Sequence, residues 1–319
     1  MKNFSNTDDL VSVIVPSYCH EEYLLDCLVS IHDQNYKNIE LVVVDDVSTD
    51  SSYLQAETLL NTSFANRFCN VILLQNDFNM GAHASINRGI CASNGSHIAI
   101  INSDDLYHPH RISMLMEALS ENGSELGFSF VKVIFDSEKP MQLDPFFRLL
   151  AVRQSIALKN DISIGFSLLR SNQAISTGNL LFTRKLYDRA GPFLPLKYCH
   201  DWDFILQSLF YTEPVVVKQE HYSYRIHGTN SFSTLGYLAG TETEVVLRRL
   251  FRRGLMGKSP NPLFPCESNW PGYFELFIQE CGYQNFLARE RGDPGTGWRT
   301  ITPTANVLEG DFSFSLYGQ

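Results

Sequence analysis

The sequence has no excess of basic residues, no long apolar run and no cysteine pattern, and each absence excludes a class of protein. With 25 Lys and Arg against 35 Asp and Glu, the formal net charge is -10 at pH 7, which argues against a nucleic-acid partner because such binding relies on clustered cations. No apolar run approaches the roughly 18 residues of a membrane-spanning helix. The seven cysteines are scattered and never form a Cys-x-x-Cys pair, so neither a disulfide framework nor a thiolate zinc site is indicated.

Two nucleotide-binding motifs are missing as well. Where a nicotinamide-dependent dehydrogenase shows Gly-x-Gly-x-x-Gly, this chain reads PSYCHEE at residues 16–22, and it has no glycine-rich phosphate loop of a kinase or ATPase. Its first residues, MKNFSNTDDL, lack the basic start and apolar core of a secretory signal. We therefore expect a cytoplasmic protein, and peripheral contact with the inner face of a membrane stays open.

What is present indicates an α/β protein. Of the 319 residues, 44% are apolar and 19% are charged, which is typical of a soluble globular chain. Short β-branched runs predict strands at 11–16, 39–44, 70–74 and 97–101, and helical patterns lie between them at 23–34, 53–60 and 81–92. This alternation predicts a mostly parallel central sheet with helices on both faces.

Each of these four strands is followed by polar residues. Ligands of such sheets bind beyond the carboxyl ends of the strands, so the polar segments predict one shared rim with a binding function. They are PSYCHEE (16–22), DDVSTDSS (45–52), QNDFNMG (75–81) and NSDD (102–105).

The second half of the chain is less regular. We expect a helix at 111–122, strand structure at 126–135, a strand entering a short helix at 176–191, a helix at 201–210 and a strand at 213–228. Residues 136–175 show no clear period and are expected to be loops around a site. The character changes beyond residue 236, which predicts a C-terminal extension over 236–319 whose last thirty or so residues are loosely ordered.

The adjacent carboxylates of Asp104 and Asp105 follow the fourth strand. Like charges on one buried loop need a cation, backbone N–H donors or a proton. Mg²⁺ or Mn²⁺ held by one or two carboxylates and a substrate diphosphate would supply the charge. The alternative is that the pair caps the next helix and turns the chain.

The other candidates also have two readings each. Asp45 and Asp46 start either a solvated turn or a site that accepts the imide N–H of a uracil, on which the ring of Tyr18 could stack. Asp201 and Asp203 lie at a helix start, where capping needs only one carboxylate and the other could be a general base.

Two features lie farther along the chain. His227 is either a strand-end histidine or an imidazole ligand of a metal held mainly by oxygens. The basic stretch LRRLFRR (247–253) could lie on an anionic membrane, but a solvated helix packed on the rest of the protein is the favoured reading.

Taken together, these pieces resemble the family 2 glycosyltransferases, which are inverting enzymes with the GT-A fold. The resemblance runs from about Val11 to about Phe232, and it rests on six segments in order. They are VSVIVPSYCHEEYLLDCLVSI, IELVVVDDVSTDSS, NMGAHASINRGICASNGSHIAIINSDDLYHPHRI, STGNLLFTRKLYDRAGPF, HDWDFILQSL and YRIHGTNSF.

The resemblance assigns roles to the residues of the rim. It implies that Pro16, Ser17 and Tyr18 line the nucleobase and ribose, and that Asp46, with Asp45 beside it, recognises the base. The donor-binding residues further include Asn102, Ser103 and Asp104 of the NSDD segment.

The resemblance also assigns the metal and the catalytic base, with three departures. Asn102 replaces the first aspartate of the family's Asp-x-Asp motif, which leaves the cation to Asp104, Asp105 and His227. His200 replaces an acidic residue before the catalytic aspartate, so Asp201 falls on the position of the general base. Ile86 stands where many relatives carry arginine.

The implied protein is an inverting glycosyltransferase that uses Mn²⁺ or Mg²⁺. A GT-A domain at 8–235 divides into a nucleotide-sugar-binding half (8–110) and an acceptor-binding half (111–235), followed by the extension at 236–319. The donor would be a nucleotide sugar, by resemblance a UDP-sugar, and the acceptor a glycan, a lipid-linked sugar or a protein. A nucleotidyltransferase acting on sugar phosphates and a catalytically silent sugar-nucleotide binding module are the alternatives.

Overall fold

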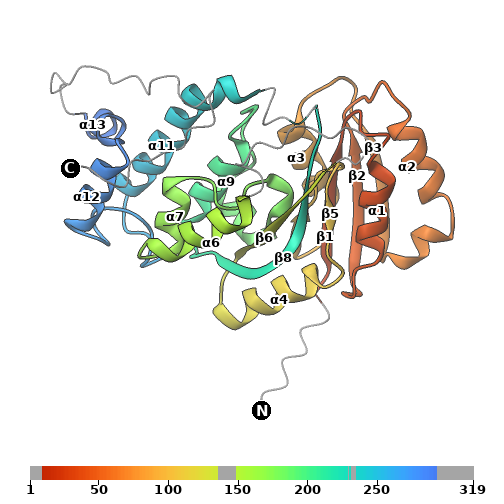
Figure 1. Ribbon diagram of the computed structural model, residues 1–319, viewed down its shortest axis with the longest axis horizontal. Coiled ribbons are helices and arrows are strands. Elements are labelled where there is room, and N and C mark those ends of the chain that lie inside the picture. The colour runs from red at the N-terminus through yellow and green to blue at the C-terminus, as the bar shows by residue number, and fades with distance from the viewer. Residues whose placement is uncertain (1–8, 136–148, 229, 231–234, 293–319) are drawn as a thin grey trace, which may run out of the picture.

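The computed structural model describes residues 9–135, 149–228, 230 and 235–292, and its centre is an eight-stranded sheet with the order β3-β2-β1-β4-β7-β6-β8-β5 (Figure 1). The strands are β1 (Val11–Ser17), β2 (Ile39–Asp45), β3 (Asn70–Gln75), β4 (His97–Ile100), β5 (Leu106–Tyr107), β6 (Leu126–Phe135), β7 (Leu181–Thr183) and β8 (Val215–Ile226). The helices are α1 (Leu24–His32), α2 (Ser52–Leu60), α3 (Ala82–Ala92), α4 (Arg111–Asn122), α6 (Leu150–Asn160), α7 (Ile164–Arg170), α8 (Arg184–Ala190), α9 (His200–Ser208), α11 (Ala239–Leu255), α12 (Tyr273–Glu280) and α13 (Gln284–Arg291).

The first half of the sheet is parallel, as the alternating pattern predicts. Strands β3, β2, β1 and β4 pair in parallel, and α1, α2 and α3 connect them in sequence. In the second half β7 is antiparallel to both β4 and β6, β8 is parallel to β6, and β5 is antiparallel to β8. The predicted α/β fold is confirmed, with a mixed second half of the sheet.

Both faces of the sheet are covered. All seven residues of β2 are buried, because the strand lies between two cores. Val42 and Val44 pack on one face with α3 and α9, whereas Leu41 and Val43 pack on the other with α1 and α4. Figure 1 shows α1 and α2 beside the parallel strands at one end of the molecule and α11, α12 and α13 at the opposite end.

The prediction of loops over 136–175 is wrong where the structure describes this stretch, because α6 and α7 lie there. The helical period of α6 is hidden, since Val152 and Ile156 face outward while Gln154 is buried. The Gln154 amide accepts a hydrogen bond from the N–H of Val131 at 3.1 Å and donates to the carbonyl of Gln173 at 2.7 Å. A buried amide in place of an apolar residue removes the signal that periodicity detects.

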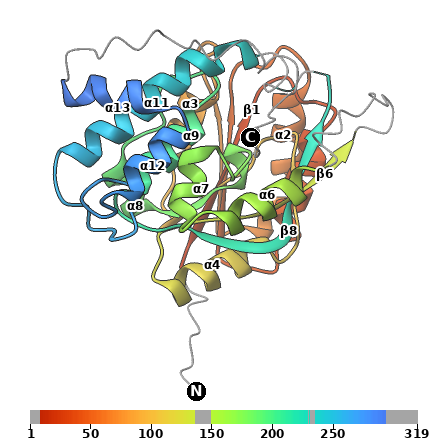
Figure 2. The ribbon, with the colours of Figure 1, turned by 60° about the vertical axis from the view of Figure 1, so that its left-hand side comes forward.

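The C-terminal helices pack on the rest of the protein. Buried side chains of α11, α12 and α13 belong to the same core as those of α7 and α9, and Figure 2 shows these helices side by side. Of the basic stretch in α11, Arg249 pairs with Asp203 of α9, and Arg253 donates to the Gln207 side chain at 2.9 Å. Arg248 and Arg252 both bind Glu290 of α13. The favoured reading of a packed helix is thus the one that the structure bears out.

The next features concern membrane-spanning helices and the last residues of the chain. Among the described residues, none of the helices is long and apolar enough to cross a membrane. The expected loose order of the last thirty or so residues concerns a stretch that, apart from its first few residues, lies outside the described part of the chain. The domain boundary near residue 235 stays a prediction.

Candidate active site

The polar segments that follow the strands are joined by hydrogen bonds, as the predicted rim requires. The backbone N–H groups of Cys19 and His20, after β1, donate to the hydroxyls of Ser48 and Ser52, after β2, each at 2.9 Å. The imidazole Nδ1 of His20 lies 2.8 Å from the hydroxyl of Ser103, after β4. Three strand ends therefore form one continuous rim.

Both carboxylate oxygens of Asp46 accept hydrogen bonds from the protein. Its Oδ1 accepts hydrogen bonds from the Asn76 amide at 2.6 Å and the Met80 N–H at 2.8 Å, and its Oδ2 accepts from the Gly81 N–H at 2.7 Å. Asp46 thereby holds the loop between β3 and α3. The structure brings Asp46 to the predicted side of the rim, with both carboxylate oxygens already bonded.

Asp45, beside Asp46, has one carboxylate oxygen that accepts no hydrogen bond from the described residues. Its Oδ2 accepts from the Ser48 N–H and the Gln75 amide, while its buried Oδ1 has no hydrogen-bond partner among the described residues. At the end of β1, the buried hydroxyl of Ser17 also has no hydrogen-bond partner among the described residues. The ring of the next residue, Tyr18, is 46% exposed. Pro16 precedes them within β1. The predicted base-binding residues thus share one end of the sheet.

In the NSDD segment, Asn102 and Ser103 form hydrogen bonds with other residues of the protein. The Asn102 amide donates to the Asp105 carboxylate at 3.2 Å and to the Ser176 hydroxyl at 2.9 Å. Ser103 is buried with its hydroxyl against His20. An amide at position 102 therefore lies beside a carboxylate without adding a second negative charge.

Asp105 is fully buried, and both of its carboxylate oxygens accept hydrogen bonds from the protein. Its Oδ1 accepts from the Arg225 N–H at 2.8 Å, and its Oδ2 accepts from the Tyr222 hydroxyl as well as from Asn102. Burial, and then the negative charge of Asp104, raises the pKa of Asp105 well above its ordinary value. Both oxygens are occupied, and Asp105 does not belong to the cluster described next.

Asp104 lies between two histidines. Its Oδ2 is 2.9 Å from Nε2 of His227 and 3.9 Å from Nε2 of His20, and its buried Oδ1 has no hydrogen-bond partner in the described part of the chain. Burial would raise the pKa of Asp104, but the hydrogen bond from His227 and the charges of both histidines outweigh it and lower the pKa. The ligand atoms of the three residues all lie within 4.8 Å of one another, which suits a divalent cation.

Asp201 is not the N-cap residue of α9, which is Cys199. The carboxylate of Glu242, from α11, accepts the N–H groups of Lys197, Tyr198 and Cys199 just before α9. Asp201 accepts hydrogen bonds from the Trp202 N–H at 2.7 Å and the Asn172 amide at 2.9 Å. Burial raises the pKa of Asp201 above its ordinary value, which is the direction that suits a general base.

The two residues beside Asp201 have structural partners. His200 is buried, its Nε2 is 3.0 Å from the Thr177 hydroxyl, and burial lowers its pKa. Asp203 pairs with Arg249, and burial raises its pKa to about 6 although Arg249 opposes the shift. Of the two aspartates in this turn, Asp203 is paired with an arginine, whereas Asp201 forms no ion pair with an arginine or lysine among the described residues.

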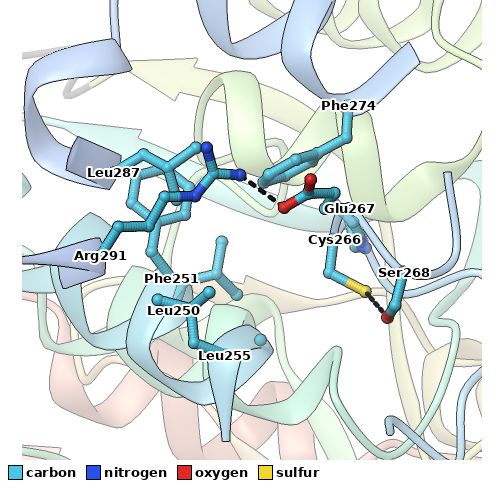
Figure 3. Close-up of a pocket in the computed structure, with 11 residues that line it drawn as sticks. Leu250, Phe251, Leu255, Cys266, Glu267, Ser268, Phe274, Leu287 and Arg291 are labelled. Carbon is cyan, nitrogen blue, oxygen red and sulfur yellow. Dashed lines mark hydrogen bonds and ion pairs between the residues drawn. The ribbon is translucent and has the colours of Figure 1, made fainter. Parts of the chain in front are cut away.

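Other positions also have definite places. Ile86 is fully buried in the core, where it contributes packing and no charge. A pocket of about 280 Å³ lies apart from the rim between α11, α12 and α13, where Arg291 and Glu267 form an ion pair at 2.5 Å (Figure 3). None of the predicted site residues lines this pocket.

Three residues of the site were missed by sequence reasoning. Asn172 falls in the stretch expected to be loops around a site, in which no single residue was chosen, and Glu242 lies in the C-terminal extension. His20 lies in the polar segment after the first strand, which was a usable signal, but its contact with Asp104 spans 84 positions of the chain and only the fold creates it.

Comparison with known proteins gives the family. Residues 12–191 match the model of glycosyl transferase family 2. An uncharacterized glycosyltransferase of Rickettsia prowazekii is 28% identical over 231 residues, which cover 70% of this chain and 66% of that protein. The match thus spans just under two thirds of the length of that relative.

Solved structures agree on the fold. TarS 1–349 of S. aureus in complex with UDP-GlcNAc is 18% identical with a TM-score of 0.54, covering 88% of this chain and 80% of that one. The mannosyltransferase PcManGT from Pyrobaculum calidifontis, in complex with GDP-Man and Mn²⁺, is 17% identical with a TM-score of 0.57, covering 89% of this chain and 73% of that one. The predicted GT-A fold is confirmed. Because the family model matches more than half of the 319 residues of this chain, the chain belongs to glycosyl transferase family 2.

Proposed function

We propose that this protein is an inverting glycosyltransferase that moves a sugar from a UDP-sugar to an acceptor hydroxyl, with Asp201 as the general base. The observation that carries the proposal is the state of Asp201. Its carboxylate is buried, is held by two hydrogen bonds and forms no ion pair with an arginine or lysine among the described residues. Those are the properties of a carboxylate positioned to take a proton.

The donor and acceptor sides lie near each other. Burial, and then the negative charges of the NSDD aspartates and of Asp201, raises the pKa of Tyr224 on β8. The side chain of Tyr224 is therefore within electrostatic range of the NSDD segment and of the proposed base. Burial, and then the charge of His200, lowers the pKa of His83 on α3, and the charge of Asp46 opposes this shift. A single reaction centre, with nucleotide groups on one side and the base on the other, is consistent with these electrostatic interactions.

Unpaired polar atoms support a nucleotide sugar as the donor. The Ser17 hydroxyl, Asp45 Oδ1 and Asp104 Oδ1 are buried without a partner among the described residues, and they come from the ends of β1, β2 and β4. Buried polar atoms normally have partners, so three at one edge of a sheet indicate a polar ligand. TarS was solved with UDP-GlcNAc, which supports a UDP-sugar.

The metal would be held by Asp104 and His227. The carboxylate and the imidazole lie 2.9 Å apart, and Asp104 Oδ1 is available, so these residues fit a divalent ion such as the Mn²⁺ of PcManGT. When bound, the ion neutralises the diphosphate of the leaving nucleotide. Both oxygens of Asp105 serve the protein, and its role as a direct ligand stays a prediction.

The reaction is a single displacement. The carboxylate of Asp201 accepts the proton of the acceptor hydroxyl as its oxygen forms a bond to the anomeric carbon. The bond from that carbon to the diphosphate oxygen breaks on the opposite face, and the nucleoside diphosphate leaves with the bonding electrons. Configuration therefore inverts, and no covalent enzyme intermediate forms. A glycan, a lipid-linked sugar or a protein as acceptor stays a prediction, as does contact with a membrane.

The test begins with a panel of nucleotide sugars, each with and without Mn²⁺, scored by thermal stabilisation and then by transfer or donor hydrolysis. We expect Asp201→Asn to lower kcat/KM by about 10²- to 10⁴-fold while donor binding stays intact. Asp203→Asn, two residues away and paired with Arg249, is the matched control and should retain most activity.

That panel, together with an assay that supplies a nucleoside triphosphate and a sugar phosphate, separates the alternatives. Wild-type turnover by Asp201→Asn with intact donor binding would overturn the assigned base. Pyrophosphate released from a nucleoside triphosphate and a sugar phosphate would indicate a nucleotidyltransferase. Binding without any turnover would indicate a silent binding module, for which the absence of a charge at Asn102 and Ile86 is the supporting observation.

A further inference from the structure

We propose that His20 is a third protein ligand of the divalent cation, beside Asp104 and His227, and that this set makes the site select Mn²⁺ or Co²⁺ over Mg²⁺. The inference deepens the proposed function, on which it rests for the identity of the site. The contacts of His20 with Asp104 and Ser103 carry the inference.

The geometry brings three ligand atoms together. Nε2 of His20 is 3.9 Å from Oδ2 of Asp104, Nε2 of His227 is 2.9 Å from the same oxygen, and one ligand atom from each residue lies within 4.8 Å of the other two. Atoms that share an ion at about 2.1 Å lie about 3–4 Å apart. The three atoms can therefore reach one ion with small side-chain movements.

His20 is held in place from both sides of its backbone. Its N–H donates to the Ser52 hydroxyl at 2.9 Å, and its carbonyl accepts the Leu24 N–H at 2.9 Å, at the start of α1. A side chain on such an anchored residue loses little further freedom when it binds an ion.

The imidazole of His20 is oriented as metal-binding imidazoles usually are. Its Nδ1 is bonded to the Ser103 hydroxyl at 2.8 Å, which directs Nε2 toward Asp104. A histidine that ligates a metal commonly uses its other ring nitrogen in such a hydrogen bond. The His20 and His227 rings are nearly perpendicular, with centroids 5.6 Å apart, so neither ring stacks over the face of the other.

A second, independent observation points to a ligand at this place. Oδ1 of Asp104 is buried and has no partner among the residues that the structure describes. Asp105, which could have added a second carboxylate, has both oxygens bonded to protein groups. The set is then two imidazoles and one carboxylate, and imidazole nitrogen favours transition ions over Mg²⁺, which prefers oxygen.

The competing explanation is that His20 only braces Ser103, and metal titration without any nucleotide separates the two. Co²⁺ binding would be followed by its visible absorption bands and by calorimetry, and Mn²⁺ and Mg²⁺ by calorimetry. We expect His20→Ala and His20→Gln to weaken Co²⁺ and Mn²⁺ binding by at least about 10-fold, with little change for Mg²⁺. His20→Asp should shift the preference toward Mg²⁺.

The controls use residues that differ from His20 in one respect each. Ser103→Ala removes the orienting hydrogen bond and leaves the ligand, so it should weaken Co²⁺ binding less than His20→Ala does. His97→Ala removes a half-buried histidine at the opposite end of β4 and should change nothing. Melting temperatures of all variants show whether each is folded.

The outcomes are distinguishable from those of the activity test. The inference is overturned if folded His20→Ala and His20→Gln bind Co²⁺ within twofold of the wild type, or if the wild type binds no Co²⁺. Transfer activity together with that result would leave the proposed function standing. Co²⁺ binding that depends on His20, without any sugar transfer, would support the metal site and contradict the proposed function.

Discussion

The side-chain amide of Asn172 donates a hydrogen bond to Oδ2 of Asp201 at 2.9 Å, and the side-chain oxygen Oδ1 of Asn172 accepts the Ala174 N–H at 3.1 Å. The second bond fixes the amide, so that its N–H₂ group points at the carboxylate. Asn172 lies two residues after the end of α7, and Asp201 lies in the first turn of α9. A hydrogen bond from a residue after α7 to a residue of α9 therefore positions the proposed base.

Replacing Asn172 by alanine should shift the pH dependence of the reaction. The hydrogen bond stabilises the charged carboxylate, so its loss raises the pKa of Asp201 further, by about one unit if the bond is worth about 1.5 kcal/mol. Because the base must be deprotonated, the acidic limb of kcat/KM should move to higher pH, with a smaller loss at pH 9. A uniform loss at every pH would instead mean that Asn172 only supports the fold.

Replacing Asn102 by aspartate, which restores the first acid of the family motif, should destabilise this protein. The new carboxylate would face Asp105, whose pKa burial and Asp104 already raise. We expect the free energy of unfolding at pH 8 to fall by about 2 kcal/mol, and by less at pH 5, where one carboxyl can hold a proton. Urea denaturation at both pH values measures this difference.

The control for that substitution is Asn102→Ala. It removes the hydrogen bonds to Asp105 and Ser176 without adding a charge, so its cost should hardly depend on pH. Equal pH dependence in the two variants would contradict the electrostatic explanation.

The pair Asp203–Arg249 should make stability depend on pH in a defined window. Burial raises the pKa of Asp203 from 3.8 to about 6, so the folded protein binds this proton more tightly than the unfolded chain. The stabilisation by protonation is fully present below pH 3.8 and is lost as the pH rises through about 6. Asp203→Asn should remove this slope, which amounts to at most about 3 kcal/mol.

The partner of Asp203 supplies the opposite variant. Arg249 lowers the pKa of Asp203, so Arg249→Gln should raise it further and extend the window to higher pH. Urea denaturation between pH 4 and pH 8 measures both variants. Parallel stability curves for the wild type and Asp203→Asn would show that Asp203 does not titrate in this range.

Replacing the buried Gln154 by leucine should lower the free energy of unfolding by about 2–4 kcal/mol. The variant leaves the Val131 N–H and the Gln173 carbonyl without their partner in the core. Ile156→Ala, on the exposed face of the same helix, is the matched control and should change stability by less than about 0.5 kcal/mol. Equal effects in the two variants would show that the amide bridge does not stabilise α6.

Part of this could be predicted from the sequence because the signals are local. Runs such as VSVIVP and IELVVV predict strands that the structure shows as β1 and β2, and their order predicts parallel pairing. In a parallel sheet, strand ends on one edge meet, so the polar residues after β1, β2 and β4 were expected to lie together and do.

The rest depends on contacts between distant residues. The burial of Gln154 inverts the pattern of α6. Glu242 binds the backbone N–H groups just before α9 from a helix that follows α9 by more than thirty residues. No local pattern reports such a pairing, since each partner has an ordinary sequence environment.

The sequence by itself therefore determined the α/β architecture, the polar rim and the candidate carboxylates, because hydrophobic period and strand order follow from residue types. Only the tertiary structure decided which of those carboxylates is available. Asp46 and Asp105 bind groups of the protein with both oxygens, whereas Asp45 and Asp104 each keep one buried oxygen without a partner among the described residues. The physical reason is that a buried carboxylate binds whichever donors the fold brings within reach, and residues far apart in the sequence supply those donors.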